Sequence, residues 1–127
     1  MTIEELTVLI CDDSLLARKS LTDSLKKAGV TNIIEVYDGQ AAVESYQANH
    51  PDVAFLDIVM PVKDGVTATR EICEYDSNAY VIIVSSVGTQ VNLREAIRAG
   101  AKDFLQKPAS PEQIRTALEH ITGVSEG

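Results

Sequence analysis

Short apolar runs alternate with longer amphipathic segments along the whole chain, and this alternation constrains the fold more than any other feature. Buried parallel strands typically read as short runs of Val, Ile and Leu, whereas the helices between them carry apolar residues at helical spacing. The alternation therefore predicts repeated strand–helix–strand units in an α/β domain. We expect strands over residues 7–11, 33–37, 53–57, 80–85 and 103–106.

Five helical segments are expected between and after these strands. The first ends at Gly29, after two lysines that suit the negative end of a helix. The last has the clearest start, because Ser110 and Gln113 form a capping box around a proline at the first helical position. A turn at Asp38 and Gly39 precedes the second helix. The three middle helices are expected to contain residues 42–46, 66–73 and 89–99.

Right-handed connections between parallel strands place helices on both faces of such a sheet. The sequence therefore predicts a doubly wound five-stranded parallel sheet with five helices, in the flavodoxin-like order 2-1-3-4-5. At 127 residues, the chain fits one domain, with an ordered core at about residues 5–122 and a frayed tail after it. Ligands of this fold bind at the carboxyl ends of the strands, beside the first strand.

Polar side chains follow the apolar runs at the point where each strand is expected to end. Asp12 and Asp13 follow the first run, Asp57 ends the third, Ser85 ends the fourth and Lys107 follows the fifth. Because the carboxyl ends of parallel strands meet at one edge, we expect all five side chains to lie close together. A cis bond before the proline that follows the lysine would direct the ammonium inward, although most X–Pro bonds are trans.

Three carboxylates at one edge repel one another unless a cation lies between them. Oxygen ligands favour a hard ion, and a sparse set that leaves room for water and phosphate favours Mg²⁺ over Ca²⁺. The simpler alternative is that each aspartate only caps the helix that follows it, and for Asp13 alone the two interpretations are evenly balanced. For the three carboxylates together we favour a metal site.

The same cluster suits phosphoryl transfer. A carboxylate such as Asp57 can accept a phosphoryl group as an acyl phosphate, and positioning together with charge neutralisation supplies most of the catalysis. Ser85 would donate its hydroxyl to a phosphoryl oxygen, and Lys107 would add a cation. Taken singly, the serine would more often bond to nearby backbone and the lysine would more often be solvated, so the prediction depends on their coincidence.

Composition excludes several other functions. The net charge of −8 argues against nucleic-acid backbones and anionic membrane surfaces. No run approaches the roughly 18 apolar residues that a membrane span needs, so we expect a cytoplasmic protein. The two cysteines, Cys11 and Cys73, are expected to be buried, reduced and free of metal, because no CxxC or histidine cluster accompanies them.

The motifs resemble those of the response-regulator receiver family, and within it they are most similar to stand-alone CheY-like chemotaxis receivers. The resemblance covers nearly the whole chain, and its motifs occur in the family's order and spacing. The segments that carry it are LICDDS at residues 9–14, FLDIVMPVKDG at 55–65, VIIVSSVG at 81–88 and AGAKDFLQKP at 99–108.

The resemblance implies a role for each residue of the cluster. Asp57 would be the phosphoacceptor, taking its group from a phosphohistidine on a sensor histidine kinase. Mg²⁺ would be bound by Asp13, Asp57 and the backbone carbonyl of Val59, with Asp12 assisting through water. Ser85 would be the switch hydroxyl and Lys107 would contact the phosphoryl group from the other side.

The resemblance also implies how the signal leaves the domain. Phe104 occupies the switch aromatic position, which the residues alone would class as core. With no effector domain after it, the chain would act by binding a downstream protein through the fourth helix, fifth strand and fifth helix, and a phosphatase would be a further partner. It would catalyse its own phosphorylation and dephosphorylation without being a turnover enzyme. Val59 and Val87 would exclude attacking water and make the phosphorylated state long-lived.

One departure from the family pattern is Ala109, where a large apolar residue is usual. A second is that the switch aromatic lacks the hydroxyl of tyrosine. Neither affects the predicted phosphorylation chemistry.

Other functions remain open from the sequence alone. A phosphorelay intermediate, which passes the group to another histidine, has the same motifs. A small Mg²⁺-dependent phosphatase with an aspartate nucleophile would need an acid two residues after Asp57, where Val59 stands. A flavin-binding module would need a phosphate-cradling loop after the first strand, where Asp12 and Asp13 would repel phosphate.

Overall fold

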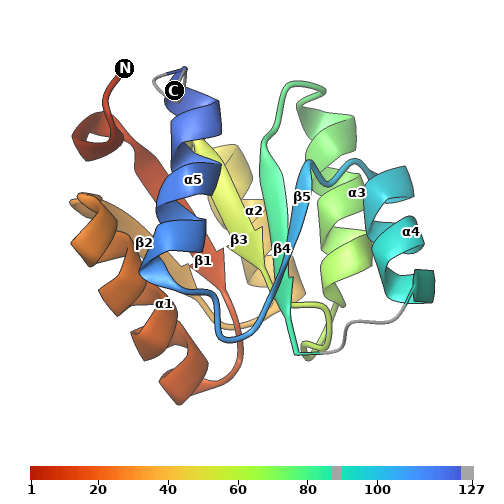
Figure 1. Ribbon diagram of the computed structural model, residues 1–127. Helices are drawn as coiled ribbons and strands as arrows, with labels where there is room; N and C mark the ends of the chain where they lie inside the picture. Colours follow the sequence, from red (N-terminus) through yellow and green to blue (C-terminus); the bar gives the residue numbers. More distant parts are fainter. Residues whose placement is uncertain (87–89, 124–127) are drawn as a thin grey trace.

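The computed structural model describes residues 1–86 and 90–123 and contains a five-stranded parallel sheet with helices on both faces (Figure 1). The strand order is β2-β1-β3-β4-β5, which confirms the predicted doubly wound fold. The strands are β1 (Thr7–Cys11), β2 (Asn32–Val36), β3 (Val53–Leu56), β4 (Val81–Ser85) and β5 (Asp103–Gln106).

Helices α1, α2, α3 and α5 begin where the sequence supplies a side-chain cap. Ser14, Asp38, Asp64 and Ser110 each accept a hydrogen bond from a backbone N–H in the first turn of the following helix. The capping box predicted at Ser110 is confirmed. The helices are α1 (Leu15–Ala28), α2 (Gly39–Asn49), α3 (Gly65–Tyr75), α4 (Gln90–Ala99) and α5 (Pro111–Thr122), preceded by a short 3-10 helix, η1 (Ile3–Glu5).

Several predicted boundaries were wrong by one or two residues. Asp38 and Gly39 were expected to form a turn, but they cap and begin α2, because the aspartate carboxylate accepts the Ala41 N–H at 2.7 Å. β2 starts at Asn32 because this residue pairs with Thr7 of β1. The predicted start of α4, residue 89, lies outside the described residues.

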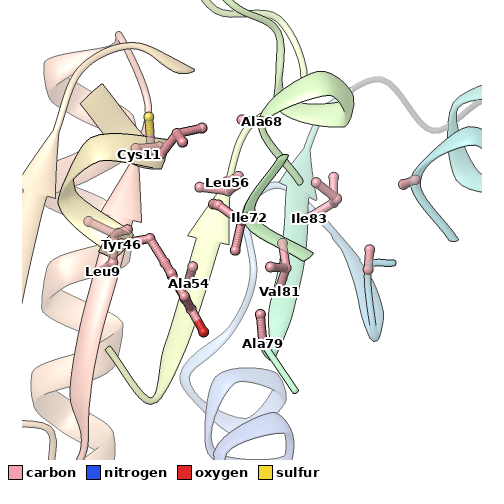
Figure 2. Packing of buried hydrophobic residues seen from close by; sticks show 14 of the residues in the cluster. Leu9, Cys11, Tyr46, Ala54, Leu56, Ala68, Ile72, Ala79, Val81 and Ile83 are labelled. Carbon is pink, nitrogen blue, oxygen red and sulfur yellow. The ribbon is translucent and has the colours of Figure 1, made fainter. Parts of the chain in front are cut away.

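Two apolar layers form the core. Strand residues of alternating orientation point to opposite faces, and α1 and α5 cover one face while α2, α3 and α4 cover the other. Figure 2 shows the second of these layers, in which strand residues pack against α2 and α3; its labelled members are Leu9, Cys11, Tyr46, Ala54, Leu56, Ala68, Ile72, Ala79, Val81 and Ile83.

Both cysteines are free, as predicted. Cys11 is buried, and burial first, with the nearby charge of Asp38 second, raises the pKa of its thiol to about 12. Cys73 was predicted to be buried, but it is only partly buried on α3, where it packs against the core beside the left-handed Gly100 that follows α4.

The strand register places the polar residues next to one another. Cys11 pairs with Leu56, so the residues that follow them leave β1 and β3 side by side, and the Asp57 N–H donates to the Cys11 carbonyl at 3.0 Å. In the same way the Lys107 N–H donates to the Ser85 carbonyl at 3.0 Å. The backbone thus brings both pairs of strand ends to the carboxyl edge of the sheet.

Candidate functional site

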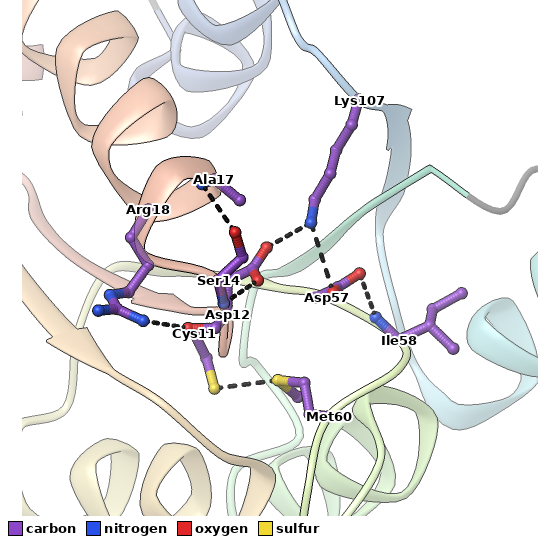
Figure 3. A network of polar contacts seen from close by, with 9 residues as sticks. All are labelled: Cys11, Asp12, Ser14, Ala17, Arg18, Asp57, Ile58, Met60 and Lys107. Atoms are coloured by element: carbon purple, nitrogen blue, oxygen red, sulfur yellow. Dashed lines mark hydrogen bonds and ion pairs between the residues drawn. The ribbon is translucent and has the colours of Figure 1, made fainter.

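Three carboxylates converge at the carboxyl edge, as the sequence predicted. Asp12, Asp13 and Asp57 each offer one oxygen, and these oxygens all lie within 4.8 Å of one another. Asp12 is buried, Asp57 is half-buried and Asp13 is exposed. Figure 3 shows Asp12 and Asp57 on either side of the Lys107 ammonium.

The backbone around Asp12 is fixed on both sides. Its N–H donates to the Val36 carbonyl at 3.3 Å, and its carboxylate Oδ1 accepts the Ser14 N–H at 2.9 Å. The N-cap of α1 is Ser14, whose hydroxyl accepts the Ala17 N–H at 3.2 Å (Figure 3). Helix capping therefore does not explain Asp13.

Lys107 forms ion pairs with the aspartates that follow β1 and β3. Its ammonium pairs with Asp12 Oδ2 and lies 3.4 Å from Asp57 Oδ2. Burial acts to lower the pKa of Lys107, but the hydrogen bond to Asp12 and the charges of both aspartates outweigh it, so the pKa is raised. The Lys107–Pro108 peptide bond is cis. The lysine is thus charged at neutral pH and lies within the cluster.

Asp57 lies in surroundings that disfavour its charge. Its Oδ1 accepts the N–H of Ile58 at 2.8 Å. Burial raises the pKa of the Asp57 carboxyl, and the charge of Asp12 raises it further, while Lys107 and the Ile58 N–H lower it without cancelling the effect. The ionised Asp57 carboxylate is therefore stabilised by any further cation that enters the cluster.

The loop after β3 folds closely beneath Asp57. The Gly65 N–H donates to the Ile58 carbonyl at 2.8 Å, and a Cβ at Gly65 would lie only 1.9 Å from the Asp57 carbonyl oxygen. Val62 has a φ of 70°, which is strained for a β-branched residue. Val59 is 67% exposed, and its predicted role in excluding attacking water stays a prediction.

The two remaining predicted residues flank the cluster. Ser85 is buried at the end of β4, where its backbone is paired with Gln106. Phe104 lies in β5, half-buried against the core layer of α2, α3 and α4. Val87, for which a solvent-excluding role was predicted, lies outside the described residues.

Ala109 lines a pocket of about 290 Å³ between α1 and the segment after β5. Asp12, Asp57 and Lys107 form one wall of it, and most of the remaining lining is apolar. The small side chain at 109 leaves this side of the cluster open.

Two residues that the sequence analysis did not assign to the site hold it in shape. Gly65 was predicted only as the end of the 55–65 motif, although the close approach to Asp57 requires a residue without a side chain. Arg18 is buried and donates to the Asp12 carbonyl at 2.7 Å. A cation in the first turn of a helix is unfavourable, and this was the signal in the sequence for its role.

The donor set fits a divalent ion. Three carboxylates and one ammonium leave a net charge of −2 in the cluster, and all the carboxylate ligand atoms are oxygen. Oxygen ligands on a cluster that is open to solvent on one side suit Mg²⁺, because this ion usually keeps several water molecules as ligands. The chemistry of the cluster therefore suits such an ion.

Comparison with known proteins decides the family. Residues 8–119 match the model of the response regulator receiver domain. The chain belongs to the response regulator receiver family. Receiver domains are signalling proteins that phosphorylation activates and that act between histidine kinases and downstream targets. The family binds Mg²⁺ at an acidic pocket.

The relatives of this receiver include several chemotaxis proteins. It is 42% identical over 115 residues to the chemotaxis protein CheY of Thermotoga maritima, which covers 91% of this chain and 96% of that protein. It resembles a CheX–CheY–BeF3–Mg complex from Borrelia burgdorferi with a TM-score of 0.84 and 35% identity, covering 92% and 89% of the two chains.

A receiver domain from a Pseudomonas aeruginosa sensor histidine kinase, with a magnesium ion in its active-site cleft, has a TM-score of 0.84 and 26% identity, covering 93% and 98%. Among the described residues, no helix is long and apolar enough to span a membrane.

Proposed function

We propose that this receiver accepts a phosphoryl group on Asp57, with Mg²⁺, from a sensor histidine kinase. The observation that carries the proposal is the position of Asp57, whose carboxylate lies 3.4 Å from the Lys107 ammonium and within 4.8 Å of Asp12 and Asp13 oxygens. Among these carboxylates, Asp57 alone follows the central strand β3.

In the transfer step, an oxygen of Asp57 attacks the phosphorus of a phosphohistidine. An oxygen–phosphorus bond forms, the nitrogen–phosphorus bond breaks, and its electron pair returns to the kinase imidazole. Lys107 balances charge on the phosphoryl oxygens, and Ser85 donates its hydroxyl to one of them. The chain thus promotes its own modification by positioning and charge, without being a turnover enzyme.

Mg²⁺ would be held by Asp13, Asp57 and the backbone carbonyl of Val59, with Asp12 assisting through water. When bound, the ion neutralises charge on the transferring oxygens. The exposure of Val59 and Asp13 supports a ligand position at the solvent side of the cluster. The buried Asp12, already paired with Lys107, is better suited to an outer role.

Output would pass through Ser85 and Phe104 to a downstream protein on the face formed by α4, β5 and α5. Ser85 gains a partner on the phosphoryl group only in the modified state, which is the differential contact that a two-state switch requires. The chemotaxis relatives support a role in chemotaxis, and the CheX–CheY complex supports a phosphatase as a further partner. We further propose that residues 1–127 form a single receiver domain; a cytoplasmic location stays a prediction.

The test is labelling by acetyl phosphate in the presence of Mg²⁺. Wild-type protein should gain one base-labile phosphoryl group by mass spectrometry, and Asp57→Asn should gain none. Asp23→Asn, an exposed acid on α1, is the control and should label like the wild type. Stoichiometric labelling of Asp57→Asn would refute the assignment.

A further inference from the structure

Arg18 of α1 makes three contacts, one with the residue that follows β1 and two with residues in and after β2. Figure 3 shows the first of them. Its guanidinium donates to the Asp12 backbone carbonyl at 2.7 Å, and its Nε lies 3.4 Å from a Glu35 carboxylate oxygen. The centre of the guanidinium lies 4.1 Å from the centroid of the Tyr37 ring. A side chain from one helix is thereby tied to β2 and to the residue that follows β1.

The position of the Arg18 guanidinium is unfavourable for the stability of the fold. Arg18 is only 9% exposed, and it lies in the first turn of α1, where the helix dipole disfavours a cation. A cation–π contact and a partly exposed ion pair with Glu35 offset part of this cost. The remaining contact, to the Asp12 carbonyl, points to a role at the cluster.

The bond to this carbonyl controls the next residue. The Asp12 carbonyl and the Asp13 N–H belong to one planar peptide unit, so a donor that fixes the oxygen also fixes the direction in which the chain enters Asp13. The other side of Asp12 is already held, since its N–H donates to the Val36 carbonyl at 3.3 Å. Arg18 completes the constraint on the turn that presents two of the three carboxylates.

We propose that Arg18 is a positioning residue for the Mg²⁺ site, acting through the Asp12–Asp13 peptide, with Tyr37 and Glu35 holding its guanidinium in place. The inference rests on the proposed function, because it concerns the same acidic cluster. Partners of metal ligands commonly alter metal affinity by about 10- to 100-fold when they are removed.

If Arg18 acted only through its charge, its removal would change the Mg²⁺ affinity in the opposite direction, so the direction of the change tests the proposal. A guanidinium this close to the cluster repels a dication, so deleting its charge should strengthen Mg²⁺ binding if Arg18 acted only as a charge. Loss of positioning should weaken binding instead. The direction of the change in affinity therefore separates the two roles.

The experiment measures the Mg²⁺ dissociation constant of the unphosphorylated protein by NMR titration, together with the melting temperature. Arg18→Met should bind Mg²⁺ about 10-fold more weakly, and Arg18→Lys should lie between it and the wild type. Lys19→Met removes an exposed charge from the adjacent position and is the matched control; its affinity should be unchanged or slightly stronger. Binding by Arg18→Met that equals or exceeds the wild type would overturn the proposal.

Two further measurements keep the outcome decisive. If Arg18→Met fails to fold, Tyr37→Leu removes the exposed ring beneath the guanidinium and should weaken Mg²⁺ binding several-fold; unchanged affinity there overturns the proposal. Without metal, hydrogen exchange at the Ser14 amide, which donates to Asp12 at 2.9 Å, should speed up in the Arg18 variant relative to Lys19→Met. Absence of Mg²⁺ binding in the wild type would count against the proposed function. Hydrogen exchange at the Ser14 amide that is the same in the Arg18 variant and in Lys19→Met would instead count against Arg18 as a positioning residue.

Discussion

Replacing Lys107 by Met should destabilise the metal-free protein by about 3 kcal/mol. The ammonium is the cation that contacts both Asp12 and Asp57, and all three side chains are largely buried, with exposed fractions of 23%, 7% and 12% for the lysine and the two aspartates. Methionine keeps the length and apolar character of the stem and removes only the charge. Two carboxylates would then face each other without a counter-ion.

The magnitude follows from the geometry. Two unit charges 3.4 Å apart attract by about 5 kcal/mol at an effective dielectric constant of ~20, and this is an upper limit because the lysine also loses hydration. Removing one partner of a buried ion pair typically costs ~3–5 kcal/mol. The partial exposure of Lys107 places the expected loss at the lower end of this range.

The loss should depend on pH and on Mg²⁺. Because the pKa of folded Lys107 is raised, its contribution is complete at pH 7 and is lost only as the pH rises through that raised value. In the variant, the pKa of Asp57, already raised by burial, rises further. The penalty is therefore complete at pH values above this raised pKa, fades as the pH falls through it and is gone below the unfolded value of about 4. A bound dication replaces the missing charge, so Mg²⁺ should stabilise the variant more than the wild type.

The assay is urea unfolding at pH 7 and pH 4, with and without Mg²⁺. Lys19→Met, which removes an exposed lysine, is the control and should change stability by less than about 0.5 kcal/mol. A variant as stable as the wild type at pH 7 without Mg²⁺, or a loss that is equal at both pH values, would show that the ion pairs do not act as described.

Two other substitutions test the loop beneath Asp57 and the route to the distal face. Gly65→Ala should lower the free energy of unfolding by ~1–3 kcal/mol and weaken Mg²⁺ binding, because the added Cβ would lie 1.9 Å from the Asp57 carbonyl oxygen. The control, Gly123→Ala, has nothing within 4 Å of its Cβ and should leave Mg²⁺ binding intact. Equal Mg²⁺ affinities of the two variants would contradict the argument. Ser85→Ala should still be labelled by acetyl phosphate, but NMR shifts near Phe104 should respond much less to phosphorylation than in the wild type. An equal response in both proteins would rule out the coupling.

The sequence by itself determined the fold class, the strand order and the place where the chemistry gathers. Apolar runs that alternate with amphipathic segments leave few topologies, because parallel strands need helical connections of one hand. Asp12, Asp57 and Lys107 could be placed together from the sequence, since the carboxyl ends of parallel strands share an edge. The fold class follows from local periodicity and chain connectivity, and the strand order is that of the known flavodoxin-like version of this fold; the structure confirms both.

Tertiary structure alone decided how the site is held. Arg18 reaches the Asp12 carbonyl from α1 and rests on Tyr37 beyond β2, and Gly65 lies against the Asp57 carbonyl. The periodicity of α1 does not show which partners a buried cation will find across the sheet, and a glycine in a loop does not reveal what approaches it. Such contacts join segments far apart in the chain, so they depend on the distances between packed elements and not on the local pattern of residues.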